Sequence, residues 1–212
     1  MTRHPRRRAA ATLLALSLLG GCASSLLPKP APPPALYTLD DGGSGAASAA
    51  PLPAPGASAP TLIVNAPRAA AGFGTSRIVY VRRAHEIEYF ALSRWVDTPS
   101  HMLTPLMARA IERTGAFRAV VSAPTAASGR FRLDTELVRL LQDFSAAPSR
   151  VRFTLSAVLI DTATRSVVAR REFDASVASS SEDPYGGVSA AQEATQRVLA
   201  ELAAFCAEAA TR

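Results

Sequence analysis

Apolar and polar positions alternate over three long segments in the second half of the chain, at 131–137, 151–159 and 167–177. A period of two is typical of β-strands that bury one face and expose the other. The connections between these segments, at 145–150 and 161–166, are short and turn-like. The pattern therefore predicts an antiparallel meander of three strands.

The period changes to that of an amphipathic helix in two places. The first helical pattern begins at Thr98, a favourable N-cap residue, and ends at Gly115. Pro105 lies inside this pattern, so it either kinks the helix or starts a second segment capped by Thr104. The second pattern covers about 188–210, and its apolar stripe should pack on the sheet.

Shorter apolar segments at 61–65, 77–82, 86–92 and 117–122 are predicted to be strands. The resulting order of elements is βββαββββα. We therefore predict an α/β fold, with a single domain over 61–212 that contains a mixed β-sheet and two packed helices.

The region before this domain has a different composition. Residues 23–60 hold nine of the chain's 16 prolines together with many alanines, glycines and serines. Such a composition is typical of a linker, because it has too few large apolar residues to form a core. One island at 36–39 consists of β-forming residues and should pair as a short strand at the edge of the sheet. We interpret residues 22–60 as a Pro/Ala/Gly-rich tether that includes this strand.

The first 21 residues have the organisation of a secretory signal peptide. Residues 1–8 are basic, residues 9–19 are apolar, and Leu19-Gly20-Gly21-Cys22 follows. The apolar run is too short to span a bilayer, which needs about 20 residues. The tetrapeptide looks like a bacterial lipobox, which predicts cleavage before Cys22 and attachment of lipid to its thiol. Because Ala23 stands where an aspartate would favour the inner membrane, resemblance to sorted lipoproteins implies the outer membrane, facing the periplasm.

Charge and cysteine content narrow the classes of function. The formal net charge is +6, but the first 21 residues contain four arginines and no acid, so the mature chain is close to neutral. This does not favour a nucleic-acid partner, which a strongly basic surface would indicate.

Lipidation of Cys22 leaves Cys206 without an intrachain partner, and the apolar helical pattern around Cys206 predicts a buried thiol.

The motifs that carry chemistry are missing from the sequence. Outside the signal peptide only His85 and His101 are available, without the spacing of a zinc site. The glycines around Phe73 lack the pattern of a nucleotide-binding loop, and no nucleophile elbow occurs. We therefore predict no metal, no cofactor and no catalytic residue, and we expect that the protein is not an enzyme.

Aromatic and basic residues gather within 16 positions of a chain that is otherwise poor in aromatics. Arginine, tyrosine and tryptophan are enriched at protein contact surfaces. Trp95 belongs to this group, but we expect it to fill the core where a strand meets the first helix. Five of the other residues are assigned to a predicted partner-contact surface, with the alternative that the arginines are simply solvated: Tyr80, Arg82, Arg83, Tyr89 and Arg94.

Several short features occur in a characteristic order and spacing: the lipobox at Cys22, Tyr37-Thr38-Leu39, Ile78-Val79-Tyr80, Tyr89 through Arg94-Trp95, Gly115-Ala116-Phe117 before Val120, Asp143-Phe144, Phe173 and Gly187-Val188-Ser189-Ala190. Through these features, from Tyr37 to the C-terminus, the chain resembles the ABC-type transport auxiliary lipoprotein family, which includes the lipoprotein of the paraquat-inducible intermembrane transport system. An Ala/Pro/Gly-rich insertion at 42–60 departs from the family pattern.

The resemblance implies a non-enzymatic periplasmic accessory of an MCE-type ABC transporter that moves lipids or other hydrophobic compounds between the inner and outer membranes. Its partner would be the MCE-domain substrate-binding protein, and its membrane contact would be the lipid anchor. Self-association into homo-oligomers stays open. Two other functions stay open: a lipid-binding carrier with its own apolar cavity, and an assembly lipoprotein of the envelope, for example in polysaccharide export.

Overall fold

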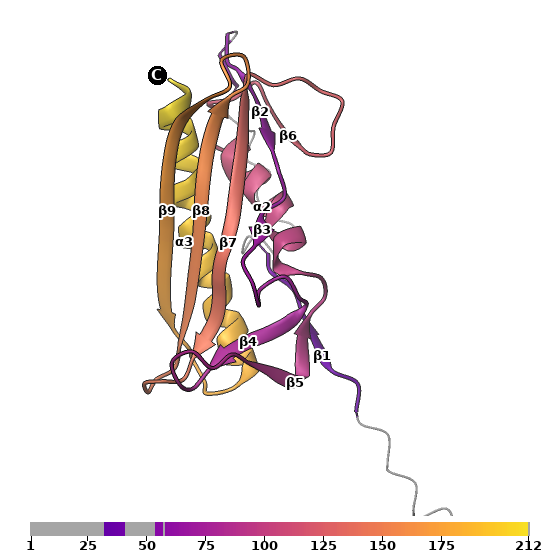
Figure 1. The fold of residues 1–212 in the computed structure, drawn as a ribbon, viewed down its shortest axis with the longest axis vertical. Helices are drawn as coiled ribbons and strands as arrows, with labels where there is room; N and C mark the ends of the chain where they lie inside the picture. The colour runs from indigo at the N-terminus through magenta and orange to yellow at the C-terminus, as the bar shows by residue number, and fades with distance from the viewer. Residues whose placement is uncertain (1–31, 41–53, 57, 212) are drawn as a thin grey trace, which may run out of the picture. The chain divides into compact units, whose positions relative to one another are not determined.

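The alternating segments form three long strands, β7 (Phe131–Asp143), β8 (Arg150–Asp161) and β9 (Ser166–Ala178). The computed structural model describes residues 32–40, 54–56 and 58–211. Strand β8 pairs antiparallel with both neighbours, which confirms the predicted meander (Figure 1).

Strand β7 is longer than the alternation of its apolar residues predicts. The pairing register with β8 shifts between Leu137 and Arg139, where β7 contains a bulge. The bulge moves the buried positions from odd to even numbers, so that Leu140 and Gln142 face inward after it. A simple period of two therefore ends at Leu137, although the strand continues to Asp143.

The second edge of β7 pairs with three shorter strands in succession. Strands β2 (Thr61–Val64), β3 (Arg68–Ala69) and β4 (Arg77–Val81) all run parallel to it. Strand β3 was not predicted, because two residues cannot establish a period. Strand β7 therefore connects the meander to all the shorter strands of the sheet.

Three further strands extend this side of the sheet at its two ends. Strand β6 (Ala119–Ser122) pairs with β2. Strand β5 (Glu88–Trp95) pairs antiparallel with β4, and β1 (Ala35–Tyr37) adds to β5 in parallel. The predicted mixed sheet is confirmed, and it includes a strand that precedes residue 61.

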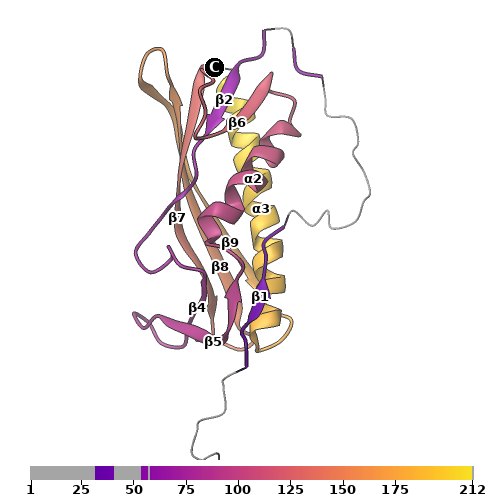
Figure 2. The same cartoon turned by 90° about the vertical axis from the view of Figure 1, so that its right-hand side faces the viewer.

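Both helices pack on the same face of the sheet, as Figure 2 shows. Helix α2 spans Pro99–Glu112 and continues through Pro105 as one helix. Thr104 does not start a new segment, because its hydroxyl donates a hydrogen bond to the Ser100 carbonyl oxygen within the same helix at 2.9 Å. Helix α3 spans Pro184–Ala210. Within the described residues, no helix combines the length and apolar character needed to cross a bilayer.

Helix α3 begins at Pro184, four residues before the predicted start at Val188. The prediction missed this first turn because two of its residues are glycines, which have no side chain to extend the apolar pattern. The Asp183 carboxylate caps the helix by accepting a hydrogen bond from the Gly186 backbone N–H at 2.8 Å. A Cβ atom on Gly186 would overlap the backbone of Ser181, and one on Gly187 would overlap the Gln142 amide. Gly187 thus allows the helix to approach β7 closely, and Gly186 leaves room for the segment that leads into the helix.

The core lies between the sheet and the two helices. Cys206 is fully buried in it, as predicted, and the thiol is free. Burial raises the pKa of this thiol to about 12. The largest fully buried side chains come from both layers: Phe153, Phe173, Leu62, Leu103, Leu106, Met107, Ile111, Leu133, Leu137, Leu155, Leu159 and Leu202.

Candidate functional site

The predicted partner-contact surface lies on the β4–β5 hairpin, and an aromatic cluster forms its interior. The Tyr80 ring lies 4.5 Å from Phe90 and 5.8 Å from Phe144, measured between centroids. Only 8% of Tyr80 is exposed. Its assignment to the contact surface was therefore wrong, because the next strand covers its ring.

The Tyr80 hydroxyl links the cluster to the polar edge of the hairpin. It donates a hydrogen bond to the Glu88 carboxylate at 2.8 Å and accepts one from the Arg82 guanidinium at 3.2 Å. The hydrogen bond to Glu88 and burial raise the pKa of Tyr80 above its ordinary value of 10.0, although the charge of Arg82 opposes this shift. The phenol is thus held in its neutral, donating form.

The two adjacent arginines extend from the closed end of the hairpin. Arg83 lies 3.0 Å from Glu86, and Arg82 lies 3.7 Å from Glu88. Their side chains are 80% and 64% exposed, so water screens both ion pairs and each contributes less than about 1 kcal/mol to stability. Weak pairs of this kind can be exchanged for pairs with a partner protein.

Tyr89 follows Glu88 near the start of β5, whereas Arg94 lies near the end of this strand, away from the closed end. The Arg77 guanidinium stands 3.6 Å above the Tyr89 ring, and the Tyr89 hydroxyl donates to the Gly72 carbonyl oxygen at 3.4 Å. Arg94 is exposed and pairs in register with Arg77 at the open end of the hairpin. The structure therefore divides the predicted surface into the closed end with Arg82 and Arg83 and the open end with Arg94.

Trp95 has the predicted role in the core. It is 3% exposed and belongs to the hydrophobic cluster beneath the sheet. Alternation along β5 places Trp95 and Ser93 on the inner side and Arg94 on the outer side. A single tryptophan thus anchors the strand whose opposite face is exposed.

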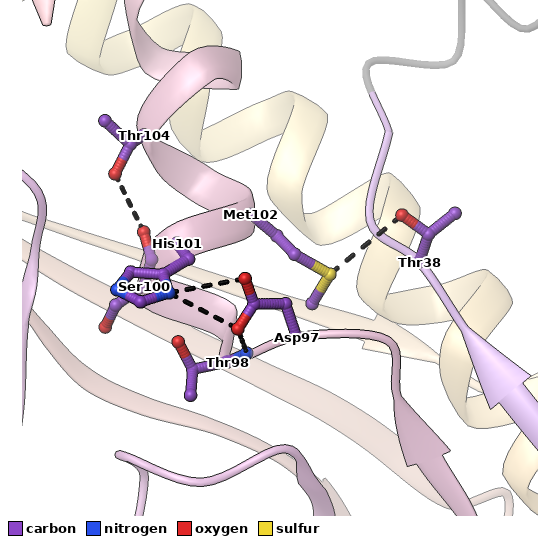
Figure 3. Close-up of polar contacts among 7 residues, drawn as sticks. All are labelled: Thr38, Asp97, Thr98, Ser100, His101, Met102 and Thr104. Atoms are coloured by element: carbon purple, nitrogen blue, oxygen red, sulfur yellow. Dashed lines mark hydrogen bonds and ion pairs between the residues drawn. The ribbon is translucent and has the colours of Figure 1, made fainter.

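The histidines do not assemble a chemical centre. His85 is exposed in the β4–β5 turn, where its backbone adopts a φ of 69°. Figure 3 shows His101 beside Asp97 at the start of α2, with Nδ1 3.3 Å from the carboxylate. Among the described residues, no group of three or more His, Cys, Asp or Glu side chains could hold a metal ion. Cys22, the predicted lipidation site, lies outside these residues.

An exposed apolar surface lies beside Arg94, and it was not predicted from the sequence. Leu36 on β1, together with Leu92 and Val96 in and just after β5, is 61%, 51% and 55% exposed. These residues and Arg94 form what we call the β1–β5 patch. The spacing of Leu92, Arg94 and Val96, two positions apart, already indicates in the sequence that they share one face of a strand. Only the pairing of β1 with β5 shows that Leu36 lies beside them.

The polar residues after β1 hold this strand against the helices. The Thr38 hydroxyl donates to the Met102 sulfur of α2 at 3.9 Å (Figure 3). The Asp40 backbone N–H donates to the Gln192 side-chain oxygen of α3 at 3.1 Å. Between them, Leu39 is 5% exposed and belongs to the core. The position of β1 is therefore determined by contacts with both helices as well as with β5.

Comparisons with known proteins agree with this fold. A family model described as the ABC-type transport auxiliary lipoprotein component matches residues 37–203. The chain is similar to a Xanthomonas campestris protein of the DUF330 family, with 24% identity and a TM-score of 0.66 over 74% of this chain and 91% of that one.

Two further solved structures are more distant in sequence. An uncharacterised protein has 11% identity and a TM-score of 0.62 over 82% of this chain and 99% of its own. A hypothetical protein of Chlamydia trachomatis has 9% identity and a TM-score of 0.51 over 71% of this chain and 96% of its own. All three likenesses show the fold alone. No curated protein matches the chain.

Proposed function

The chain belongs to the family of ABC-type transport auxiliary lipoprotein components, and on that premise we propose that it is the non-enzymatic accessory of an MCE-type transport system. In this role it is anchored by Cys22 in the outer membrane and faces the periplasm. It contacts the MCE-domain substrate-binding protein of a transporter that moves lipids or other hydrophobic compounds between the two membranes. The family match over 37–203 carries this proposal.

The interior of the domain supports a contact role in preference to lipid carriage. The apolar cavity beneath Trp95, between the sheet and the first turns of α3, has a volume of about 10 Å³. This is room for about one water molecule, whereas a site for a lipid-sized ligand needs several hundred Å³. Hollows of about 350 and 670 Å³ occur elsewhere in the described residues, but they are open at the surface and include polar or charged side chains such as Gln196 and Asp134. We therefore infer that the protein acts through its surface and that the substrate passes through the partner.

We assign the closed end of the β4–β5 hairpin to the contact with the MCE-domain protein. The side chains of Arg82 and Arg83 are 64% and 80% exposed, and their ion pairs with Glu88 and Glu86 are weak enough to be exchanged for pairs with a partner. Long-range attraction by such charges speeds the association of proteins with complementary acidic surfaces.

A pull-down with the purified MCE-domain protein tests this assignment. Arg82→Glu combined with Arg83→Glu should weaken capture about tenfold or more, because two attractive charges become repulsive. The matched control reverses two exposed arginines that are consecutive in the sequence but lie on β9, outside the hairpin. This variant, Arg170→Glu with Arg171→Glu, should leave capture unchanged. Full capture by the hairpin variant would contradict the assignment of this surface.

Cell fractionation tests the anchor separately. Cys22→Ser should remain unprocessed or leave the outer-membrane fraction, because only a thiol can form the thioether to diacylglycerol. A Cys22→Ser variant that is processed and retained like the wild type would contradict lipidation at this residue. Recovery of the wild type in the inner membrane would contradict the proposed location but leave the anchor intact.

A further inference from the structure

The β1–β5 patch combines exposed apolar side chains with an arginine. Parallel pairing sets Leu36 opposite Arg94, and Leu92 and Val96 lie two positions to either side of Arg94 on the same face of β5. Three aliphatic side chains therefore surround Arg94. Antiparallel pairing places the backbone of Arg77 of β4 beside Arg94, and the Arg77 guanidinium extends from there to the Tyr89 ring, so a second cation borders the patch.

Among the described residues, the two arginines lack acidic partners. Neither Arg77 nor Arg94 forms an ion pair with a described residue, whereas Arg82, Arg83 and several other arginines do. Both guanidinium groups can therefore bind anionic groups from outside the chain, and phosphate groups match arginine well.

Exposed apolar residues concentrate at this end of the domain. Of the six large hydrophobic side chains that are exposed in the described part of the chain, Leu36, Ile87, Leu92, Val96 and Tyr185 lie on β1, the β4–β5 hairpin or the first turn of α3. Figures 1 and 2 show these elements together at one end of the sheet. The sixth, Val167, lies at the start of β9, near the other end of β7.

The N-terminal tether leads directly into this patch. Strand β1 contains Leu36, and only 13 residues lie between Cys22 and Leu36. Even a fully extended chain of this length spans no more than about 50 Å. Once Cys22 is acylated, the patch thus cannot be farther than this from the bilayer surface, whereas longer stretches of chain separate Cys22 from every other element.

We propose that the β1–β5 patch docks on the phospholipid surface to which the chain is tethered. Leu36, Leu92 and Val96 enter the interfacial region, and Arg77 and Arg94 bind lipid phosphates. This combination of aliphatic side chains and arginines is the chemistry of interfacial membrane binding. The proposal rests on the lipid anchor of the proposed function, and it defines the orientation of the domain against the membrane.

Site-specific quenching of a fluorescent label tests the proposal in the full lipidated chain. The variants Leu92→Cys and Val167→Cys are each labelled with a small fluorophore and reconstituted into vesicles of phosphatidylethanolamine, phosphatidylglycerol and brominated phosphatidylcholine. Cys206 should not react, because it is buried and its thiol pKa is about 12. Val167 is a matched control, since it is also exposed but lies at the far end of β7, a strand of 13 residues that spans about 40 Å.

Bromine quenches only over short range, so we expect strong quenching of the label at residue 92 and none at residue 167. Adding Arg77→Glu and Arg94→Glu should reduce the fraction of quenched label at residue 92 about tenfold, because each reversal replaces attraction to anionic lipid with repulsion. Equal quenching at the two positions, or quenching that persists after the charge reversal, would overturn the proposal.

Flotation of the same vesicles separates failure of the patch from failure of the anchor. A chain that does not float contradicts lipidation of Cys22 and with it the proposed function. A chain that floats with an unquenched label at residue 92 contradicts the patch alone. If that label becomes shielded from aqueous iodide only when the MCE-domain protein is added, the patch is a protein interface and the membrane assignment is wrong.

Discussion

Two outward surfaces of the same sheet differ in how their polar groups are paired. On the outer face of the meander, the Arg139 guanidinium donates to the Thr154 hydroxyl at 2.8 Å, and that hydroxyl donates to the Asp174 carboxylate. Nearby, Arg152 lies 3.7 Å from Asp143. On the β1–β5 patch, aliphatic side chains surround Arg94, which has no acidic partner among the described residues.

The difference indicates that only the meander face is built to remain in water. Its charged and hydroxyl groups satisfy one another across the strands, which is the usual pattern for the solvated side of an antiparallel sheet. The patch leaves both apolar area and charge uncompensated, which is typical of a surface that meets another surface. Five substitutions test this contrast.

The largest effect should come from the residue beneath the patch. Trp95→Ala should lower the free energy of unfolding by about 3 to 5 kcal/mol, because it removes a large buried ring and leaves a cavity. Urea unfolding followed by circular dichroism measures the change. An unchanged midpoint would mean that Trp95 does not anchor β5, and the inner and outer faces of this strand would not differ as described.

Gly186→Ala tests the close packing between the first turn of α3 and the segment that leads into it, at the same end of the domain. A Cβ atom there would overlap backbone atoms of Ser181, which cannot move aside easily. We expect a loss of about 1 to 3 kcal/mol, although the same change in an open helix is favourable. Gly56→Ala is the control, because nothing lies within 4 Å of its Cβ position. Equal unfolding midpoints for the two variants would contradict the steric argument.

Thr154→Val tests the polar pairing on the meander face. The substitution keeps the side-chain shape but removes the hydroxyl that bridges Arg139 and Asp174, and Thr154 is fully buried. A loss of about 1 to 2 kcal/mol is expected, because both neighbours lose a partner. Thermal unfolding of the variant beside the wild type gives the value, and a stabilised variant would show that this network does not contribute.

The ion pair of Asp143 should make the stability of the meander face depend on pH. Burial raises the pKa of this carboxyl, but hydrogen bonds from Ser145 and the charge of Arg152 outweigh burial and lower it below its ordinary 3.8. Its contribution is therefore present above about pH 4 and is lost as the pH falls through the lowered pKa. Asp143→Asn should cost less than about 1 kcal/mol at pH 7.

Unfolding curves at pH 7 and pH 3 measure this effect. The difference between Asp143→Asn and the wild type should become smaller at pH 3, where the carboxyl begins to be protonated. A difference that is the same at both pH values would show that the charge of Asp143 plays no part.

The smallest effect on stability should come from the patch itself. Leu92→Ser should change the free energy of unfolding by no more than about 0.5 kcal/mol, because the side chain is half exposed and away from the core. The same variant should weaken contact with anionic vesicles. A large loss of stability would mean that Leu92 packs within the domain, and the contrast between the two surfaces would disappear.

Elements with many regular positions were predictable from the sequence. The three long strands and both helices follow from periods of 2 and 3.6, because burial on one side of an element repeats along the chain. Local disturbances of these periods limited the prediction. The bulge in β7 interrupts the period of two, so the last part of the strand, from Leu140 to Asp143, was not predicted. The first turn of α3 was not predicted either, because Gly186 and Gly187 have no side chain to show which face is buried.

Part of the candidate site was also predictable. The sequence pointed to the β4–β5 region and to a buried Trp95, because aromatic and basic residues are otherwise sparse in this chain. It did not distinguish the buried Tyr80 from the exposed Arg82, because both are amphipathic side chains that occur in cores and at surfaces. It also did not predict the patch, because Leu36 and Leu92 are 56 positions apart.

By itself the sequence determined the class of fold, the family and the expected attachment of the N-terminus, since these depend on local periods and short contiguous motifs. The tertiary structure alone decided which residues share a surface. Pairing of β1 with β5 brings Leu36 to Arg94, and pairing of β4 with β5 brings Arg77 to the same place. Register between distant strands depends on packing of the whole core, so no local pattern could show that these residues meet.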